Sequence, residues 1–166
     1  MKRILLAIIF LMSVICSFGQ ITADTIIKEA NYTSYFNYRF HEPIYVVYTL
    51  YKGGGKCSRT GDVFVTNNLP HSATAADYSH NGYDEGHMAN AEDFAFNCAL
   101  QKNTFKYYNC VPQTPRLNRG CWKQLETLVR KESQSDSLLI ICGNIYGTKT
   151  IGKNKIAVPE YCYKIV

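Results

Sequence analysis

The residues from Leu117 to Arg130 constrain the fold most, because their apolar side chains repeat with the period of a helix. Wound at about 100° per residue, these side chains form one stripe roughly 140° wide. The stripe consists of Leu117, Cys121, Trp122, Leu125, Leu128 and Val129. Pro115 suits the first turn of a helix. We therefore predict one main helix from about Pro115 to Lys131, with this stripe against a hydrophobic core.

Other segments predict strands, because they are rich in β-branched and aromatic residues. The candidates are Pro43–Lys52, Ser137–Gly143, Lys155–Val166, Gly61–Thr66, Phe105–Val111 and part of Asn31–Phe40. The rest of residues 20–43 looks irregular, residues 67–86 look like a loop, and a short helix is expected at Ala89–Asn97. This order predicts the α+β class, with a mostly antiparallel sheet.

Residues 1–19 have the layout of a secretory signal peptide. Lys2 and Arg3 precede a mostly apolar run from Ile4 to Ile15. We expect cleavage after Gly19, so that the protein is exported and is secreted or periplasmic. An alternative is a lipoprotein signal anchored at Cys16, which the bulky residue before that cysteine disfavours. The apolar run is too short for a comfortable membrane span.

The remaining residues, 20–166, suit a single domain. The whole chain is 46% hydrophobic and 19% charged, so it can bury a core and need not be disordered. Loss of the signal lowers the formal net charge from +5 to about +3, which permits a polyanionic partner without requiring one.

Six cysteines remain after Cys16 leaves with the signal: Cys57, Cys98, Cys110, Cys121, Cys142 and Cys162. An even number in an exported chain predicts disulfides. Six cysteines allow 15 pairings, and the sequence does not choose among them. The absence of a C-x-x-C pair argues against a zinc ribbon.

Two polar residues of the predicted helix invite two interpretations. Asn118 lies within the angular range of the apolar stripe, and Glu126 lies about 40° beyond its edge. Asn118 could simply cap a turn, while Glu126 and Arg130 form a surface ion pair at i,i+4 spacing. Alternatively, Asn118 and Glu126 project toward one pocket, where an amide oxygen binds Mg²⁺ and a carboxylate holds its waters.

Two further segments favour the pocket. "DEGH" places His87 in a turn beside Asp84 and Glu85, and "NCVPQ" places Asn109 just before the helix. A histidine that takes a proton from water, next to a cation that neutralises a phosphate, is the chemistry of a one-metal hydrolase.

These motifs resemble the DNA/RNA non-specific endonucleases. "GYDEGHMANAEDF" (Gly82–Phe94), followed by "NCVPQTPRLNRGCWKQLE" (Asn109–Glu126), matches the order of the family's Asp-Arg-Gly-His and Asn-x-x-Pro-Gln motifs and of its helical Asn, Trp and Glu. The resemblance runs from about residue 44 to 166. It implies a ββα-metal (His-Me finger) motif, with the main helix as the active-site helix.

The resemblance also implies roles for individual residues. His87 is the general base, and Asn118 is the direct protein ligand of Mg²⁺ or another divalent cation such as Mn²⁺. Glu126 holds metal-bound water. The remaining implied roles fall to Asp84, which orients the site; Asn109, which supports it; Arg130, which contacts phosphate or stabilises the site; and Arg59, which helps to stabilise the transition state.

The sequence departs from the family pattern at three places. Glu85 replaces the usual arginine of the first motif, which puts a negative charge near a phosphate. Asn90 stands where a proline is common. The chain ends after a stretch that resembles a family strand normally followed by more protein, so a short C-terminus is expected.

The sequence therefore predicts an exported, metal-dependent endonuclease that acts on DNA, RNA or both with little sequence specificity. One alternative is a catalytically silent nucleic-acid-binding module of the same fold, which Glu85 would explain. Another is a disulfide-bonded secreted protein that binds a different protein. Nucleic-acid preference, native metal, disulfide pairing, oligomeric state and biological role stay open at this stage.

Overall fold

The computed structural model describes residues 21–166, so the predicted signal peptide lies outside the described residues. Five antiparallel strands form the main sheet in the order β1-β2-β3-β6-β7. The strands are β1 (Thr25–Lys28), β2 (Thr33–Asn37), β3 (Glu42–Leu50), β6 (Leu138–Ile151) and β7 (Ile156–Ile165). The predicted α+β class with a mostly antiparallel sheet is confirmed.

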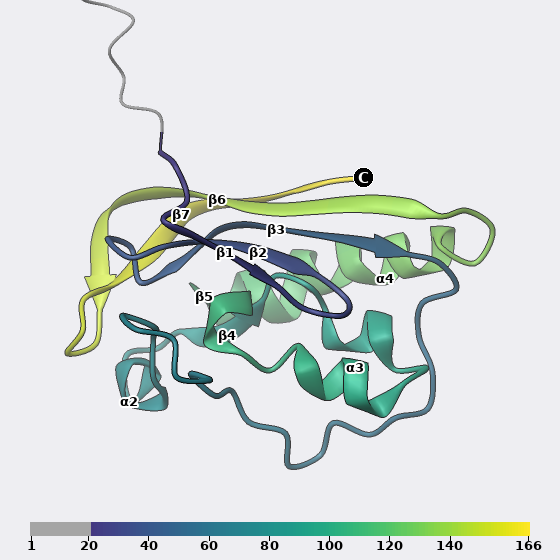
Figure 1. Cartoon of the computed structure of the whole chain (residues 1–166), viewed down its shortest axis with the longest axis horizontal. Coiled ribbons are helices and arrows are strands. Elements are labelled where there is room, and N and C mark those ends of the chain that lie inside the picture. Colours follow the sequence, from purple (N-terminus) through teal and green to yellow (C-terminus); the bar gives the residue numbers. More distant parts are fainter. Residues whose placement is uncertain (1–20) are drawn as a thin grey trace, which may run out of the picture.

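Residues 51–137 leave the sheet after β3 and return to it at β6, and they form the second layer of the molecule below the sheet (Figure 1). Its strands and α-helices are α2 (Ala75–Tyr78), β4 (Asp84–His87), α3 (Cys98–Asn103), β5 (Cys110–Gln113) and α4 (Lys123–Glu132). Two 3₁₀ turns, η1 (Ala91–Phe94) and η2 (Tyr107–Asn109), and a helical segment η3 (Leu117–Trp122) that is kinked at Gly120 complete it. Strands β4 and β5 pair with each other, apart from the main sheet.

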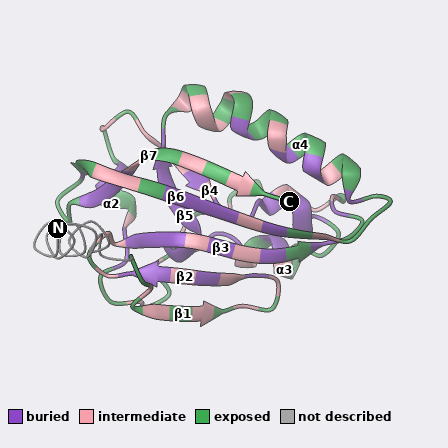
Figure 2. Cartoon of the chain, turned by 90° about the horizontal axis from the view of Figure 1, so that it is seen from above, coloured by how far each residue is buried: buried purple, intermediate pink, exposed green. Residues whose placement is uncertain are grey.

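The hydrophobic core lies between the two layers. Phe36, Val46 and Ile140 point down from the sheet, and Met88 and Trp122 meet them from below. In Figure 2 the central strands β3 and β6 carry most of the buried positions of the sheet. Several predictions of strand position are confirmed here, because β3, β6 and β7 fall on the candidates Pro43–Lys52, Ser137–Gly143 and Lys155–Val166.

Other predictions were wrong in detail. Gly61–Thr66 forms no strand, because Val65 makes only an isolated bridge to Lys106. The strand candidate within Asn31–Phe40 is confirmed as β2, but the rest of residues 20–43 is not irregular, because β1 pairs with β2 there. The predicted strand Phe105–Val111 is a 3₁₀ turn followed by β5, and the expected helix at Ala89–Asn97 is reduced to the turn η1.

The expected framework of several disulfides was also wrong. One bridge joins Cys57 to Cys98. The other described cysteines are free: Cys110, Cys121, Cys142 and Cys162. Cys110 and Cys142 are fully buried in the two hydrophobic clusters, where a thiol packs as a small apolar group. The stability of the domain therefore depends on its core more than on cross-links.

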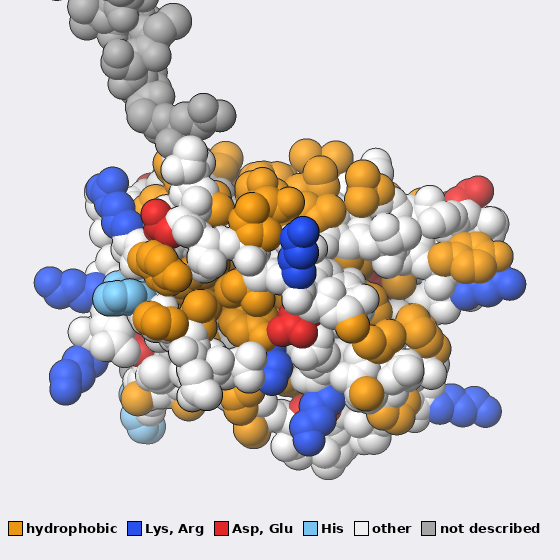
Figure 3. All heavy atoms as spheres, in the orientation of Figure 1, with side chains coloured by type: hydrophobic (Ala, Val, Ile, Leu, Met, Phe, Trp, Pro, Cys, Tyr) orange, Lys and Arg blue, Asp and Glu red, His pale blue; other side chains and the backbone are white. Residues whose placement is uncertain are grey.

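The outer face of the main sheet carries exposed apolar side chains, which gather along the top of the molecule in Figure 3. One row crosses all five strands at paired positions and contains Ile26, Tyr35, Tyr45, Gly143 and Tyr163. The rings of Tyr35 and Tyr45 stack with centroids 4.2 Å apart. No helix within residues 21–166 is long and apolar enough to cross a membrane.

Candidate active site

A pocket of about 650 Å³ opens below the sheet between the helix of residues 115–132, the β4–β5 pair and the loop after β3. It is lined by Arg59, Glu85, His87, Asn90, Glu92, Asn118, Arg119, Lys123, Glu126 and Arg130. Six of the eight residues singled out in the sequence therefore line one pocket. The other two, Asp84 and Asn109, hydrogen-bond to residues in or beside it.

His87 is the last residue of β4, where the sequence had predicted a turn. Asp84–His87 pairs with Cys110–Gln113, and Pro112 sits inside β5 opposite Glu85 instead of forming a turn. Gly86 permits the close pairing, because a Cβ there would lie 2.4 Å from Oε1 of Gln113. The two strands and the following helix form a ββα unit with His87 at its edge.

The imidazole of His87 packs against two aromatic rings that also contact each other. Its centroid lies 4.5 Å from that of Phe64 and 4.6 Å from that of Phe105. Its Nε2 is buried and has no hydrogen-bond partner within residues 21–166, so Nδ1 is the nitrogen that can serve the pocket. Burial, and then the charge of Arg59, lower the pKa of His87 to about 3. The ring is therefore neutral at physiological pH, the form that can accept a proton.

Asn118 is held by Asp84. The Asn118 amide donates a hydrogen bond from Nδ2 to Oδ2 of Asp84 at 3.0 Å, which leaves its Oδ1 as an acceptor toward the pocket. Arg119 donates two hydrogen bonds to the same carboxylate, from Nε at 2.8 Å and from Nη2 at 2.6 Å. These bonds to Arg119 and Asn118 lower the pKa of Asp84, so it stays ionised.

Glu126 faces the core side of the pocket and is 7% exposed. Burial raises its pKa to about 7, while the charges of Lys164 and Arg130 oppose the increase. Lys164 comes from β7, and its buried ammonium lies 4.9 Å from the ring centroid of Trp122. A cation beneath Glu126 thus stabilises the ionised carboxylate.

The helix carries Glu126 further inward than α-helical geometry predicts. The predicted helix is confirmed over residues 115–132, but it is interrupted at Gly120, whose φ of −105° and ψ of −114° are not helical. Residues after this kink therefore do not keep the angular positions of one continuous α-helix. Leu128 of the predicted stripe is consequently 54% exposed, and Glu126 takes its place inside. The interpretation of Glu126 and Arg130 as a surface ion pair was wrong.

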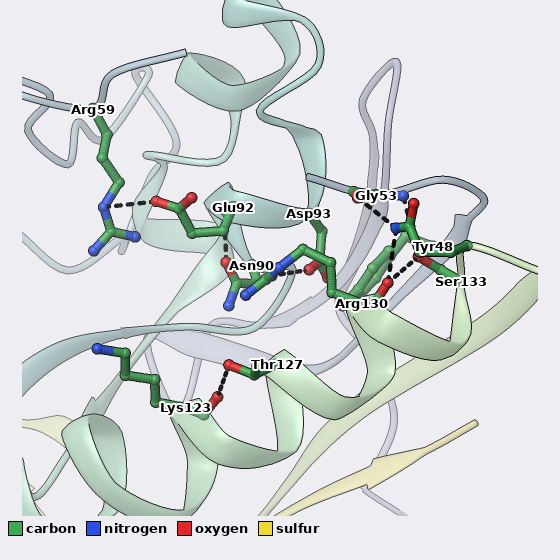
Figure 4. A network of polar contacts seen from close by, with 11 residues as sticks. Tyr48, Gly53, Arg59, Asn90, Glu92, Asp93, Lys123, Thr127, Arg130 and Ser133 are labelled. Atoms are coloured by element: carbon green, nitrogen blue, oxygen red, sulfur yellow. Dashed lines mark hydrogen bonds and ion pairs between the residues drawn. The ribbon is translucent and has the colours of Figure 1, made fainter. Parts of the chain in front are cut away.

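Two of the pocket's arginines, Arg130 and Arg59, pair with acids from η1 (Figure 4). Arg130 makes a short ion pair with Asp93, whose other oxygen accepts a hydrogen bond from Tyr48 at 2.9 Å. Arg59 lies 3.4 Å from Glu92. Asn90 caps η1 by accepting from the Glu92 amide at 2.7 Å, so the residue that departs from the family proline organises this turn.

Asn109 and Glu85 have clear supporting contacts. The buried Asn109 accepts from the Ala89 amide at 2.7 Å and donates to the carbonyls of Ala89 and Thr104, each at 2.9 Å. It therefore fixes the chain just after His87. Glu85 accepts a hydrogen bond from Tyr107 at 2.7 Å, which holds its carboxylate on the pocket wall.

Asp93, Lys164 and Phe64 contribute to the site although no sequence motif points to them. Asp93 lies inside the quoted acidic segment, and its pairing with Arg130 depends on tertiary contacts. Lys164 sits in a strand that carries no motif, and Phe64 lies in a segment mistaken for a strand. Their sequence neighbours gave no signal of proximity to the site.

The residues present fit a hard divalent cation. The free amide oxygen of Asn118 and the carboxylate of Glu126 are the oxygen ligands that such ions prefer. No cluster of three His, Cys, Asp or Glu suited to a metal occurs in the described part of the chain. A cation here would thus have few protein ligands and would keep several waters.

The antiparallel sheet and the ββα unit define the ββα-metal nuclease fold. Agreement with a solved structure is close: a chain from "Crystal structure of the EndoG/EndoGI complex: Mechanism of EndoG inhibition" superposes with a TM-score of 0.80 at 25% identity, over 92% of this chain and 71% of that one.

The chain belongs to the DNA/RNA non-specific endonuclease family, whose model matches residues 13–166. Human mitochondrial endonuclease G is 33% identical over 109 residues, which cover 58% of this chain and 37% of the human protein. A nuclease of Nostoc sp. is 37% identical over 94 residues, which cover 56% of this chain and 34% of that protein. The matched region thus spans little more than a third of either relative.

Proposed function

We propose that this protein is an exported, metal-dependent endonuclease that hydrolyses phosphodiester bonds in DNA, RNA or both with little sequence specificity. One observation carries the proposal: His87 from β4 and Asn118 and Glu126 from the helix of residues 115–132 line a single pocket together with Arg59 and Arg130. A neutral histidine next to an oxygen-ligand pair and two guanidinium groups suits hydrolysis of an anionic ester.

In this mechanism His87 accepts a proton from the attacking water. Asn118 and Glu126 would hold Mg²⁺, or another divalent cation such as Mn²⁺, together with its waters. When bound, the cation supplies charge neutralisation at the scissile phosphate. Arg59 faces the substrate phosphate, and Arg130 keeps guanidinium nitrogens available beyond its bond to Asp93. Contacts of this kind go to the backbone of the nucleic acid, which accounts for low sequence specificity.

Export forms part of the proposal. The layout of residues 1–19 favours it, and so does the bridge between Cys57 and Cys98, since disulfides persist in oxidising compartments. The lipoprotein form anchored at Cys16 remains the alternative. Processing can be tested by expressing the full chain with a C-terminal tag and sequencing the N-terminus of the mature protein. A mature protein that begins near residue 20 is expected, and retention of Met1 would contradict export.

Cleavage is tested with plasmid DNA and with RNA, in Mg²⁺ and in EDTA, using wild type and His87→Ala. Wild type should degrade the substrate only with the metal, and the variant should lose about 10²–10⁴-fold in rate. His80→Asn is a matched control, because His80 is exposed, lies outside the pocket and has a positive φ that Asn tolerates.

Three results would contradict parts of the proposal. If His87→Ala cleaves as fast as wild type, His87 is not the general base. If wild type cleaves fully in EDTA, the reaction does not require a metal. Binding of nucleic acid without any cleavage would instead favour the silent binding module.

A further inference from the structure

The pocket contains four cationic side chains, and three of them are already engaged with carboxylates. Arg119 binds Asp84 in a bidentate manner, and the other two arginines pair with acids of η1. Lys123 differs, because no carboxylate in residues 21–166 lies at ion-pairing distance from it. Its charge is therefore uncompensated at the mouth of the pocket.

The position of Lys123 is fixed by the helix. Lys123 is the first residue of α4, shortly after the kink at Gly120, and its carbonyl accepts a hydrogen bond from the Thr127 hydroxyl at 2.9 Å. The side chain itself is exposed and makes no hydrogen bond in the described structure. In Figure 4 it extends toward the side of the pocket where Arg59 lies. A rigid backbone thus presents a free ammonium group to whatever enters.

From this arrangement we infer that Lys123 anchors a backbone phosphate of the nucleic acid, next to the phosphate that is cleaved. This inference rests on the proposed function and names one binding contact of the same site. An engaged arginine must share its charge with its carboxylate, whereas Lys123 can give its full charge to a phosphate. A lysine ammonium contacts phosphate as a point charge with little geometric demand, so the anchor is indifferent to base sequence.

The contact can be measured without cleavage. Binding of a short fluorescent duplex is titrated in EDTA at several salt concentrations, with wild type, Lys123→Gln, Lys123→Arg and Lys131→Gln. Lys131 is the matched control, because it is exposed on the same helix and lies outside the pocket. We expect Lys123→Gln to weaken binding about three- to tenfold and to reduce the slope of log K against log salt by about one.

Lys123→Arg should retain most of the affinity, and duplexes of different sequence should lose affinity equally in Lys123→Gln. In cleavage assays with metal, the same variant should raise KM and leave kcat nearly unchanged. If Lys123→Gln keeps the wild-type salt dependence of binding, the phosphate contact of Lys123 is contradicted. An equal loss of affinity in Lys131→Gln and Lys123→Gln would contradict it as well. Neither result would contradict the proposed nuclease activity. Failure of wild type to bind or cleave at all would instead remove the proposed function.

Discussion

Glu85 puts a carboxylate on the wall of a pocket whose substrate would be an anion. A hydrogen bond from Tyr107 holds this carboxylate on the pocket wall. The Glu85 side chain would have to break that bond to move away from a phosphate. We predict that Glu85→Arg lowers KM for DNA at low salt, because repulsion is replaced by attraction. Glu85→Gln should give an intermediate KM, since it removes charge and keeps the shape. An unchanged or higher KM in both variants would show that Glu85 does not oppose substrate binding.

Glu126 should make metal affinity depend on pH near neutrality. Its raised pKa of about 7 in the metal-free protein means that the carboxyl group is neutral below pH 7 and ionised above. Because a cation favours the ionised form, binding must displace a proton at low pH. Affinity for Mg²⁺ should therefore rise about tenfold per pH unit up to pH 7 and level off above it.

Calorimetric titration with Mg²⁺ at several pH values, in buffers of different ionisation enthalpy, measures both the affinity and the released proton. Glu126→Gln is the control, because it cannot ionise and should show weak, pH-independent binding. A wild-type affinity that stays flat between pH 5.5 and 8 would contradict the assigned role of Glu126.

At the scale of elements, several contacts anchor the loop after β3, which carries Arg59. Gln134 donates to the Gly53 carbonyl at 2.8 Å, and the Gly55 backbone, at a φ of +152°, passes so close to Ala95 that a Cβ would lie 2.0 Å from its carbonyl oxygen. The bridge from Cys57 to Cys98 comes only two residues before Arg59. The loop lacks regular structure, so these anchors decide where the guanidinium lies.

Removal of the bridge should therefore reduce cleavage more than it reduces folding. We expect the double variant Cys57→Ser, Cys98→Ser to lose activity toward the level of Arg59→Ala, while its circular dichroism stays that of the wild type. When the double cysteine variant is combined with Arg59→Ala, activity should fall little below that of Arg59→Ala alone. The reason is that loss of the disulfide and loss of Arg59 both act through the Arg59 side chain. Additive losses would mean that the bridge acts elsewhere. Mixing wild type with dithiothreitol provides an independent check.

The main helix and strand β4 show how far the sequence predicts secondary structure. The helix was predictable in extent, because its apolar period is strong, yet the kink at Gly120, after which Glu126 faces inward, leaves no mark in that period. Asp84–His87 looked like a turn because Gly and acids favour loops. It is a strand because tertiary pairing with β5 supplies its hydrogen bonds, and local propensity is weaker than that pairing.

At the scale of the molecule, the last strand contributes to the site from the opposite layer. Lys164 reaches from β7 toward the helix that carries Glu126, and its charge is the largest influence that opposes the raised pKa of Glu126. We predict that Lys164→Met moves the pH at which Mg²⁺ affinity levels off to a higher value, because that charge is lost. Lys153→Met, at an exposed turn, should leave it in place. Identical pH profiles for Lys164→Met and wild type would exclude this coupling.

The sequence predicted which residues come together in the pocket only where several motifs indicated the same site. His87, Asn118 and Glu126 were identified in this way, and the pocket does bring them together. The partners Asp93 and Lys164 were not, because each acts across a long separation in sequence and lies in no motif. Local sequence patterns predict local structure. The partners of a buried charge are set by tertiary contacts, which such patterns do not contain.

The position of residues 51–137 has a consequence for the order of folding events. Strands β3 and β6 are neighbours in the sheet, yet this whole segment, with nearly every pocket residue, lies between them in the chain. Their pairing must close a long loop before the contacts repay the lost entropy, a step that slows folding in proteins of high contact order. The centre of the sheet and the pocket should then mature in one late kinetic phase, so that refolded β-structure and recovered activity rise with the same time constant.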